Sequence, residues 1–455
     1  MKTRMNFKDE FYQKLKLLVL PIAIQNFMLA LVSATDAIML GWIDQTSLSA
    51  VSLAGQVQFV LSLFISGIAA GAGIMAAQYW GKRDAASIEK VIPIALRTNL
   101  LFSGLFTILA GFCPEILMRI FTNDVALVAS GSQYLRAVAL SYVLCGISQV
   151  YLILLKNTGH AAVSSRISST AVVLNIILNA ILIYGLCGAP ALGIRGAAYA
   201  TVAARVVELI WAYLETKKPE RVRILWNRLF SSAGKILSED FWRYTLPVLA
   251  ASLVWGIAYV LYSVIMGHMG SDAVAANSIT SIAKSLLSCL IRGVSGGAGV
   301  LIGNLLGADE LEKAREYGGR LTHLAIAIGV VTGGLLMLIS PAIVHFAPLT
   351  DTAAEYLQYM LLFCGLNLMA QSVNTTVLDG IFCAGGDAKF DMQGNIGAMW
   401  CFSVPLGFLA AFWLKLPVMV VYCIVNLDEI VKLPAVYLHY KKYVWVRNIT
   451  RDIEE

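Results

Sequence analysis

Apolar residues recur along the chain in twelve stretches of about 20 or more residues, separated by short polar segments. The stretches cover residues 15–42, 52–80, 91–112, 133–155, 165–188, 192–214, 245–268, 277–305, 321–346, 355–384, 396–414 and 417–439. A helix of about 20 residues spans roughly 30 Å of hydrocarbon, so each stretch is long enough for one transmembrane crossing. The pattern predicts an all-α integral membrane protein with twelve transmembrane helices.

The composition agrees with that prediction. Of the 455 residues 58% are hydrophobic and only 14% are charged, and the mean hydropathy is +0.73. An ordinary soluble domain carries about 25% charged residues. No cleaved signal peptide is expected, because the first apolar stretch is too long for one. The eight cysteines form no CxxC pair and the five histidines are dispersed, so no metal site is predicted.

Lysine and arginine are distributed unevenly between the alternating loops. Of the 34 basic residues, 25 fall on the side of the N-terminus, whereas only Arg119, Arg195 and Lys415 fall on the opposite side. The positive-inside rule therefore places both termini in the cytoplasm. The net charge of +6 is explained by membrane topology, and no nucleic-acid partner is expected.

The two halves of the chain align with each other at a constant offset of 226 residues over about 60 residues. The matched pairs include Pro21 with Pro247, Gly41 with Gly267, Gly71 with Gly297 and Gly73 with Gly299. Six crossings per half give both copies the same orientation, and such parallel repeats are a recurring design of transporters. We therefore expect two six-helix lobes around a central cavity.

The repeat divides the chain into three predicted segments. Residues 1–214 form an N-lobe with helices one to six, and residues 245–455 form a C-lobe with helices seven to twelve and a cytoplasmic tail. The basic segment 215–244 is expected to be a cytoplasmic linker, either solvated or in contact with anionic lipid.

Several motifs resemble those of one known family. The first helix reads "PIAIQNFMLALVSATDAIMLGWIDQTSLSAVSLAG", the second reads "GIAAGAGIMAAQYWGKRD", and the fifth and sixth read "LNIILNAILIYGLCGAPALGIRGAAYAT". The tenth helix ends in "GIFCAGGDAKF", and the last helix and tail read "VNLDEIVKLPAVYLHYKKYVWVRNIT". In this order, the motifs resemble the multidrug and toxic compound extrusion (MATE) transporters of the multidrug/oligosaccharidyl-lipid/polysaccharide flippase superfamily. The resemblance implies efflux of drugs or metabolites driven by a proton or sodium gradient.

The chain departs from the family pattern at acidic positions. Where sodium-coupled relatives are expected to carry a Glu in helix seven and an Asp in helix ten, this chain has Trp255 and Ser372. Asn179 replaces the Asp of another branch in helix five, and Cys383 replaces the usual Arg of helix ten. The resemblance therefore leaves Asp36 as the candidate for ion coupling.

The candidate site of the N-lobe is centred on Asp36, an acid inside the first apolar stretch. Such residues are costly in lipid and face the protein interior or water. Asn175 and Asn179 are four residues apart on one helix face and could bond with Asp36, and Gln149 and Thr201 could join them. The alternatives are a carboxylate that reaches water at the helix end and polar residues that only pack helices together.

The C-lobe contains a second set of charges inside its apolar stretches. They are Lys284, Arg292, Asp379, Asp428, Glu429 and Lys432. Intramembrane charges usually pair, so the first hypothesis is a structural ion-pair network. The alternative is a second site for substrate or coupling ion.

Together these features predict a secondary active transporter of the cytoplasmic (plasma) membrane rather than an enzyme. It would export drugs or metabolites, with organic cations expected, by antiport with H⁺ and less readily with Na⁺ through rocker-switch alternating access. The expected partners are a small-molecule substrate and membrane lipid; the protein is expected to be a monomer without a cofactor. The alternatives are a flippase for lipid-linked precursors, suggested by Lys284 and Arg292, and an intramembrane enzyme.

Overall fold

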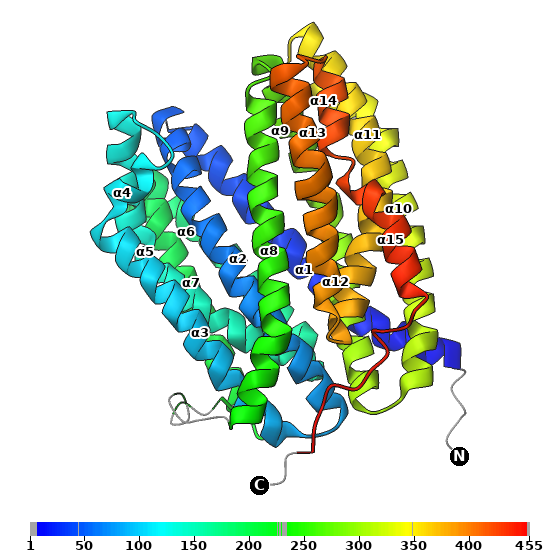
Figure 1. Ribbon diagram of the computed structural model, residues 1–455. Coiled ribbons are helices and arrows are strands. Elements are labelled where there is room, and N and C mark those ends of the chain that lie inside the picture. Colours follow the sequence, from blue (N-terminus) through cyan, green and yellow to red (C-terminus); the bar gives the residue numbers. More distant parts are fainter. Residues whose placement is uncertain are drawn as a thin grey trace. The chain divides into compact units, whose positions relative to one another are not determined.

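The computed structural model describes residues 7–43, 45–224, 226, 229, 234–347 and 349–452. Figure 1 shows long helices in both halves of the chain, coloured from blue to red. The first half contains α1 (Phe7–Gly41), α2 (Gln45–Gly81), α3 (Ala85–Phe112), α4 (Pro114–Arg119), α5 (Val125–Leu155), η1 (Lys156–His160), α6 (Ala161–Tyr184), η2 (Leu186–Gly188) and α7 (Ile194–Thr216). The second half contains α8 (Lys235–Gly267), α9 (Ser271–Gly307), α10 (Leu311–Phe346), α11 (Asp351–Thr375), η4 (Thr376–Phe382), α12 (Ala388–Asn395), η5 (Ile396–Ser403), α13 (Val404–Phe408), η6 (Leu409–Trp413), α14 (Val418–Val425) and α15 (Asp428–Tyr440).

In the described part of the chain, ten helical stretches are long and apolar enough to cross a membrane. One of them, Val125–Tyr184, contains both α5 and α6 and accounts for two crossings. The chain turns between these helices at Gly159, which has a φ of 82°. A further crossing is divided between α14 and α15. The predicted all-α architecture with twelve transmembrane helices is confirmed.

The last predicted crossing, 417–439, is not a continuous helix. Asn426 follows α14, and its side-chain Nδ2 donates to the carbonyl oxygen of Tyr422 at 3.0 Å. The carbonyl oxygen of Asn426 accepts a hydrogen bond of 2.6 Å from Nδ2 of Asn367 on α11. Because a side chain of the bundle satisfies this freed backbone group, the helix can break within the membrane span.

The sequence repeat reappears in the element boundaries. Helix α2 spans Gln45–Gly81 and α9 spans Ser271–Gly307, so both ends of α9 follow those of α2 at the same offset as the sequence repeat. The turns that follow also match, since Arg83 and Asp309 both have positive φ values, of 64° and 60°. The constant offset therefore extends from residue identity to backbone conformation.

Glycines of α9 allow the first part of α1 to pack closely against the second half of the chain. An added Cβ at Gly293 would lie 2.6 Å from Cβ of Ala23, and one at Gly297 would lie 2.8 Å from a methyl group of Val19. These distances are shorter than side-chain carbons allow. The glycines of this stretch therefore permit close helix packing.

The equivalent glycines of α2 pack in the same way against α8. An added Cβ at Gly67 would lie 2.9 Å from Cα of Leu249, and one at Gly71 would lie 2.7 Å from Cα of Thr245. Each of these contacts is the repeat partner of an α9 contact, displaced by the constant offset. The first helix of each repeat therefore packs, through its first half, against the second helix of the other repeat.

This exchange explains the two compact units of the structure. Unit 1 combines the described residues up to Asn26 with Ala250–Asp452, and unit 2 comprises Phe27–Leu249. Helices α1 and α8 each contribute to both units. The predicted segments 1–214, 215–244 and 245–455 follow the sequence repeat, and as domain boundaries they stay a prediction. Part of the linker, at 225, 227–228 and 230–233, lies outside the described residues.

Candidate functional site

In unit 2, the Asp36 side chain lies in the C-terminal part of α1, half-buried against α6. Its Oδ1 accepts a hydrogen bond of 2.6 Å from Nδ2 of Asn179. The hydroxyl of Tyr184 donates to the carbonyl oxygen of Met39 at 2.7 Å, which joins α6 to α1 less than one turn from Asp36. The carboxylate is therefore held by α6 rather than directed into lipid.

The hydrogen bonds continue from Asn179 to α7. Nδ2 of Asn179 also lies 3.2 Å from Oδ1 of Asn175, one helical turn away. Nδ2 of Asn175 donates to the Thr201 hydroxyl at 3.3 Å, and that hydroxyl donates to the carbonyl oxygen of Ala197 at 3.0 Å. The sequence-predicted Asp36, Asn175, Asn179 and Thr201 thus form one continuous chain of hydrogen bonds.

Gln149 and the amide oxygen of Asn179 take no part in these hydrogen bonds. Gln149 on α5 is half-buried and makes no hydrogen bond to the chain among the described residues. Oδ1 of Asn179 is buried and has no hydrogen-bond partner among them. A buried acceptor without a partner is costly unless water, a proton donor or a ligand satisfies it. Asn179 therefore has capacity for one further partner beside Asp36.

A separate ion pair lies on α7. Arg205 Nη1 and Glu208 Oε2 are 2.5 Å apart and three residues apart in sequence, and the Glu208 side chain is fully buried. The Ser148 hydroxyl of α5 donates to the same carboxylate oxygen at 3.4 Å. The pair is local, as its spacing predicts, and no hydrogen bond within the described part of the chain joins it to Asp36.

In unit 1, Lys432 of α15 is the centre of a buried charge cluster. Its Nζ lies 3.1 Å from Oε1 of Glu429 and 3.7 Å from Oδ2 of Asp428, and donates to Oδ1 of Asn395 at 3.1 Å. Nδ2 of Asn395 in turn donates to Oδ1 of Asp391 at 3.1 Å. We refer to Asp391, Asn395, Asp428, Glu429 and Lys432 as the Lys432 cluster.

Other predicted charges of unit 1 lie outside the Lys432 cluster. Lys284 is half-buried, and its ammonium donates to Oδ1 of Asn367 at 3.0 Å. Arg292 and Asp379 are exposed and belong to no salt bridge among the described residues. The expected ion-pair network therefore includes Asp428 and Glu429, whereas Arg292 and Asp379 remain available for other partners.

Three buried polar groups of unit 1 were missed from the sequence. Asn374 donates to Oε2 of Glu429 at 2.8 Å, and Asn395 and Asp391 belong to the Lys432 cluster. Asp391 and Asn395 lie between the predicted crossings 355–384 and 396–414, but α12 already begins at Ala388. The early helix start, after the positive-φ Gly386, is what carries these residues into the bundle.

Ser372, at the position where the resemblance leads us to expect an acid in sodium-coupled relatives, has a structural role in this chain. It is 1% exposed, and its hydroxyl donates to the carbonyl oxygen of Ala325 on α10 at 2.7 Å. Trp255, at the other such position, stacks on Tyr259 with ring centroids 5.6 Å apart. Neither residue offers a charge to an ion. In the described residues, no group of three or more His, Cys, Asp or Glu could hold a metal.

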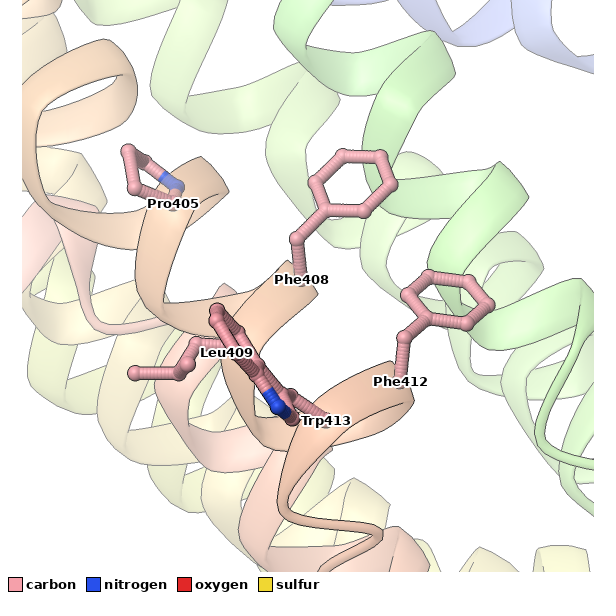
Figure 2. A pocket seen from close by; sticks show the side chains of 5 residues that line it. All are labelled: Pro405, Phe408, Leu409, Phe412 and Trp413. Carbon is pink, nitrogen blue, oxygen red and sulfur yellow. The ribbon is translucent and has the colours of Figure 1, made fainter.

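An apolar hollow lies on one turn of unit 1. Figure 2 shows Pro405, Phe408, Leu409, Phe412 and Trp413, all from α13 and η6, with Phe408 and Phe412 projecting together on one side. The Phe408 and Phe412 rings stack at 5.4 Å, and Trp413 is 83% exposed. Because its lining side chains are almost entirely apolar, this surface suits lipid chains rather than a coupling ion.

The fold and its intramembrane polar groups define the class: a multi-pass membrane protein built from two six-helix repeats, a design typical of secondary transporters. The MatE family model matches the chain twice, over residues 21–181 and 247–409, and the two matches start at the same offset as the sequence repeat. The chain belongs to the MatE family and is a MATE transporter.

Individual relatives are distant but nearly full-length. The uncharacterized transporter YisQ of Bacillus subtilis is 21% identical over 94% of this chain and 93% of its own length. The probable multidrug resistance protein YoeA of the same organism is 21% identical over 99% and 98%. A solved outward-facing MATE family multidrug resistance transporter has a TM-score of 0.85 at 20% identity and covers 95% of each chain. That similarity establishes the shared fold.

Proposed function

We propose that this protein is a secondary active efflux transporter that exports drugs or metabolites in exchange for protons, with Asp36 as the coupling residue. The observation that carries the proposal is the 2.6 Å hydrogen bond from Asn179 to the half-buried Asp36. A carboxyl group in this setting can be held either charged by the amide donor or neutral by a proton. Proton uptake from outside would neutralise Asp36 and favour release of the substrate.

The geometry supports a proton over sodium. Hard cations bind through several oxygen ligands. Asn179 presents nitrogen, not oxygen, to Asp36, and Asn175 presents its nitrogen to Thr201. Without side-chain rotation, Oδ1 of Asn179 is a free oxygen beside Asp36, but a sodium site needs several such oxygens, whereas one carboxyl group is enough for a proton.

The sequence and the relatives support the proposed membrane location and direction of transport. The excess of Lys and Arg on the side of the N-terminus supports insertion in the plasma membrane with both termini in the cytoplasm. Curated relatives carry the name probable multidrug resistance protein. Export of organic molecules from the cytoplasm is the function that these two facts support.

Reconstitution into liposomes tests the proposal. With an imposed pH gradient, the wild-type protein should drive transport of a fluorescent organic cation such as rhodamine 123, and a sodium gradient alone should not. Asp36→Asn should abolish gradient-driven transport because it removes the proton-binding carboxyl group. The matched control is Asp309→Asn, in the turn after α9 at a φ of 60°, where Asn is tolerated. Unchanged transport by Asp36→Asn, or transport driven by sodium alone, would overturn the proposal.

A further inference from the structure

Helix α9 has a polar face that runs along most of its length. Polar residues recur at intervals of three and four, which places them on one side of the helix. They are Ser278, Ser281, Ser285, Ser288, Arg292 and Ser295. Ser278, Ser285 and Arg292, spaced by seven residues, are exposed, whereas Ser288 and Ser295 are buried against neighbouring helices. We call this set the α9 polar face.

The exposure of Arg292 indicates that the α9 polar face lies against water rather than lipid. It lies near the middle of a span of 37 residues and is exposed in the structure. A charge at a helix centre costs roughly 2.5–3.5 kcal/mol in lipid, so exposed intramembrane charges line water-filled regions. Ser285 and Ser278, one and two heptads before Arg292, are also exposed. Their hydroxyl groups are compatible with water, whereas a helix face against lipid would not require them. The guanidinium is therefore accessible to a dissolved molecule.

Asp379 provides a charge of opposite sign on the neighbouring helix. The Ser295 hydroxyl donates to the carbonyl oxygen of Thr375 at 2.9 Å, and an added Cβ at Gly380 would lie 2.9 Å from the carbonyl oxygen of Ser295. Helix α9 and η4 are thus in close contact beside Asp379. Asp379 is exposed, and the charged groups within electrostatic range of it are Asp391, Lys432 and Glu429 of the Lys432 cluster and, more weakly, Arg292. No salt bridge among the described residues joins Asp379 to Arg292.

Other intramembrane charged groups of unit 1 already have partners within the protein. Lys432 is surrounded by Glu429, Asp428 and Asn395, and Lys284 donates to Asn367. The buried charges of the Lys432 cluster therefore have protein partners, whereas the exposed Arg292 and Asp379 belong to no salt bridge among the described residues. The accessible pair consists of one carboxylate and one guanidinium, whose five donors make no hydrogen bond to any residue that the structure describes.

We propose that Arg292 and Asp379 form a substrate subsite in unit 1 that binds an organic zwitterion. Arg292 binds the carboxylate of the substrate, and Asp379 binds its cationic nitrogen. A planar guanidinium matches a carboxylate with two parallel hydrogen bonds, which an ammonium or a simple organic cation does not offer. The subsite deepens the proposed function, on which it rests for its role in transport, by naming zwitterions rather than simple cations as the preferred substrate class.

The test compares two dyes that differ in a single group. Rhodamine 110 carries a free carboxylate beside its cationic ring system, and its methyl ester, rhodamine 123, is a plain cation. Binding to the purified full-length protein in lipid nanodiscs is measured by fluorescence anisotropy. The wild-type protein should bind rhodamine 110 about tenfold more tightly than the ester, because only the free carboxylate makes a charge-assisted bidentate pair with Arg292.

Variants assign the preference to the two residues. Arg292→Gln should abolish the preference for rhodamine 110 and leave binding of the ester within about twofold, and Arg292→Lys should keep part of it. Asp379→Asn should weaken binding of both dyes, because both carry the cationic ring. Arg136→Gln, which removes an exposed Arg that pairs with Glu115 in unit 2, should keep the wild-type preference. Equal binding of the two dyes by the wild type, or an unchanged preference in Arg292→Gln, overturns the subsite.

The outcomes separate this subsite from proton coupling. Asp36→Asn should lose gradient-driven transport of rhodamine 123 and retain the binding preference for rhodamine 110. Arg292→Gln should lose the preference, and the transport of rhodamine 123 that this variant supports should still depend on the pH gradient. If the wild-type protein shows the binding preference but no proton-driven transport, the subsite stands and the proposed function fails. If it shows proton-driven transport but no preference, the proposed function stands and the subsite fails.

Discussion

At the scale of single residues, the position of one amide determines the setting of Asp36. Asn179 is the direct donor to the carboxylate, at 2.6 Å, and it is fully buried. Asn175 reaches Asp36 only through Asn179, and Thr201 supports Asn175. The sequence predicted which residues would meet, because the spacing of four places both amides on one face. It could not show which amide bonds directly to Asp36, because that depends on which of the two side chains lies against α1.

This ranking gives a testable difference between two matched amide substitutions. Asn179→Ala removes a hydrogen bond to a charged group, which is worth about 1.5–3 kcal/mol, so proton-driven transport should fall by about tenfold or more. Asn175→Ala removes only the indirect contact and should change transport by no more than about threefold. Initial rates in liposomes at a fixed pH gradient measure both. Equal losses in the two variants would contradict the direct role of Asn179.

At the scale of elements, breaks in helices place the charged groups of unit 1. Asp379 lies in the π-helical η4, and Asp428 begins α15 after the break at Asn426. A regular helix over 355–384 or 417–439, as the apolar stretches predict, would turn these side chains to other faces. The sequence indicates the length of a crossing, since apolar length reports hydrocarbon thickness. It does not indicate the break, which depends on Asn367 reaching the Asn426 carbonyl.

The turn between α5 and α6 depends on one glycine. Gly159 has a φ of 82°, a left-handed conformation that costs other L-residues roughly 1–2 kcal/mol. Gly159→Ala should therefore lower the thermal unfolding midpoint of the purified protein. Gly159→Asn is the matched control and should lower it less, because Asn adopts this conformation more readily. Fluorescence-detected unfolding in one detergent compares them, and an Ala variant as stable as wild type would show that the turn tolerates a change in φ.

At the scale of the whole molecule, the two repeats exchange their first helices: the first helix of each repeat packs against the second helix of the other. Gly71 and Gly297 are repeat partners, and each packs against the first helix of the other repeat, at Thr245 and Val19. The same exchange divides α1 and α8 between the two compact units. Alignment of the halves could show that the motifs recur, but could not show which copy of the first helix packs against which copy of the second.

Packing at these exchanged contacts should be sensitive to a single methyl group. A Cβ at Gly71 would lie 2.7 Å from the backbone Cα of Thr245, so Gly71→Ala forces the helices apart and should cost about 1–3 kcal/mol. The matched control is Gly55→Ala in the same helix, where no atom lies within 4 Å of the added Cβ. Thermal unfolding should show a lower midpoint for Gly71→Ala alone. Similar midpoints for both variants would rule out a tight contact at Gly71.

The sequence alone determined the number of crossings, the internal repeat and the family resemblance. It also gave Asp36, Asn175, Asn179 and Thr201 as candidates for one site, together with Gln149, which the structure leaves out. All of these depend on local properties of the sequence: the length of apolar stretches, the constant spacing of the repeat, side-chain identity and helical periodicity. Only the tertiary structure decided that Glu429 pairs with Lys432, that Arg292 and Asp379 stay accessible, and that the first helices are exchanged. Those outcomes depend on which helix faces meet across long sequence separations, and hydrophobic periodicity leaves that choice open.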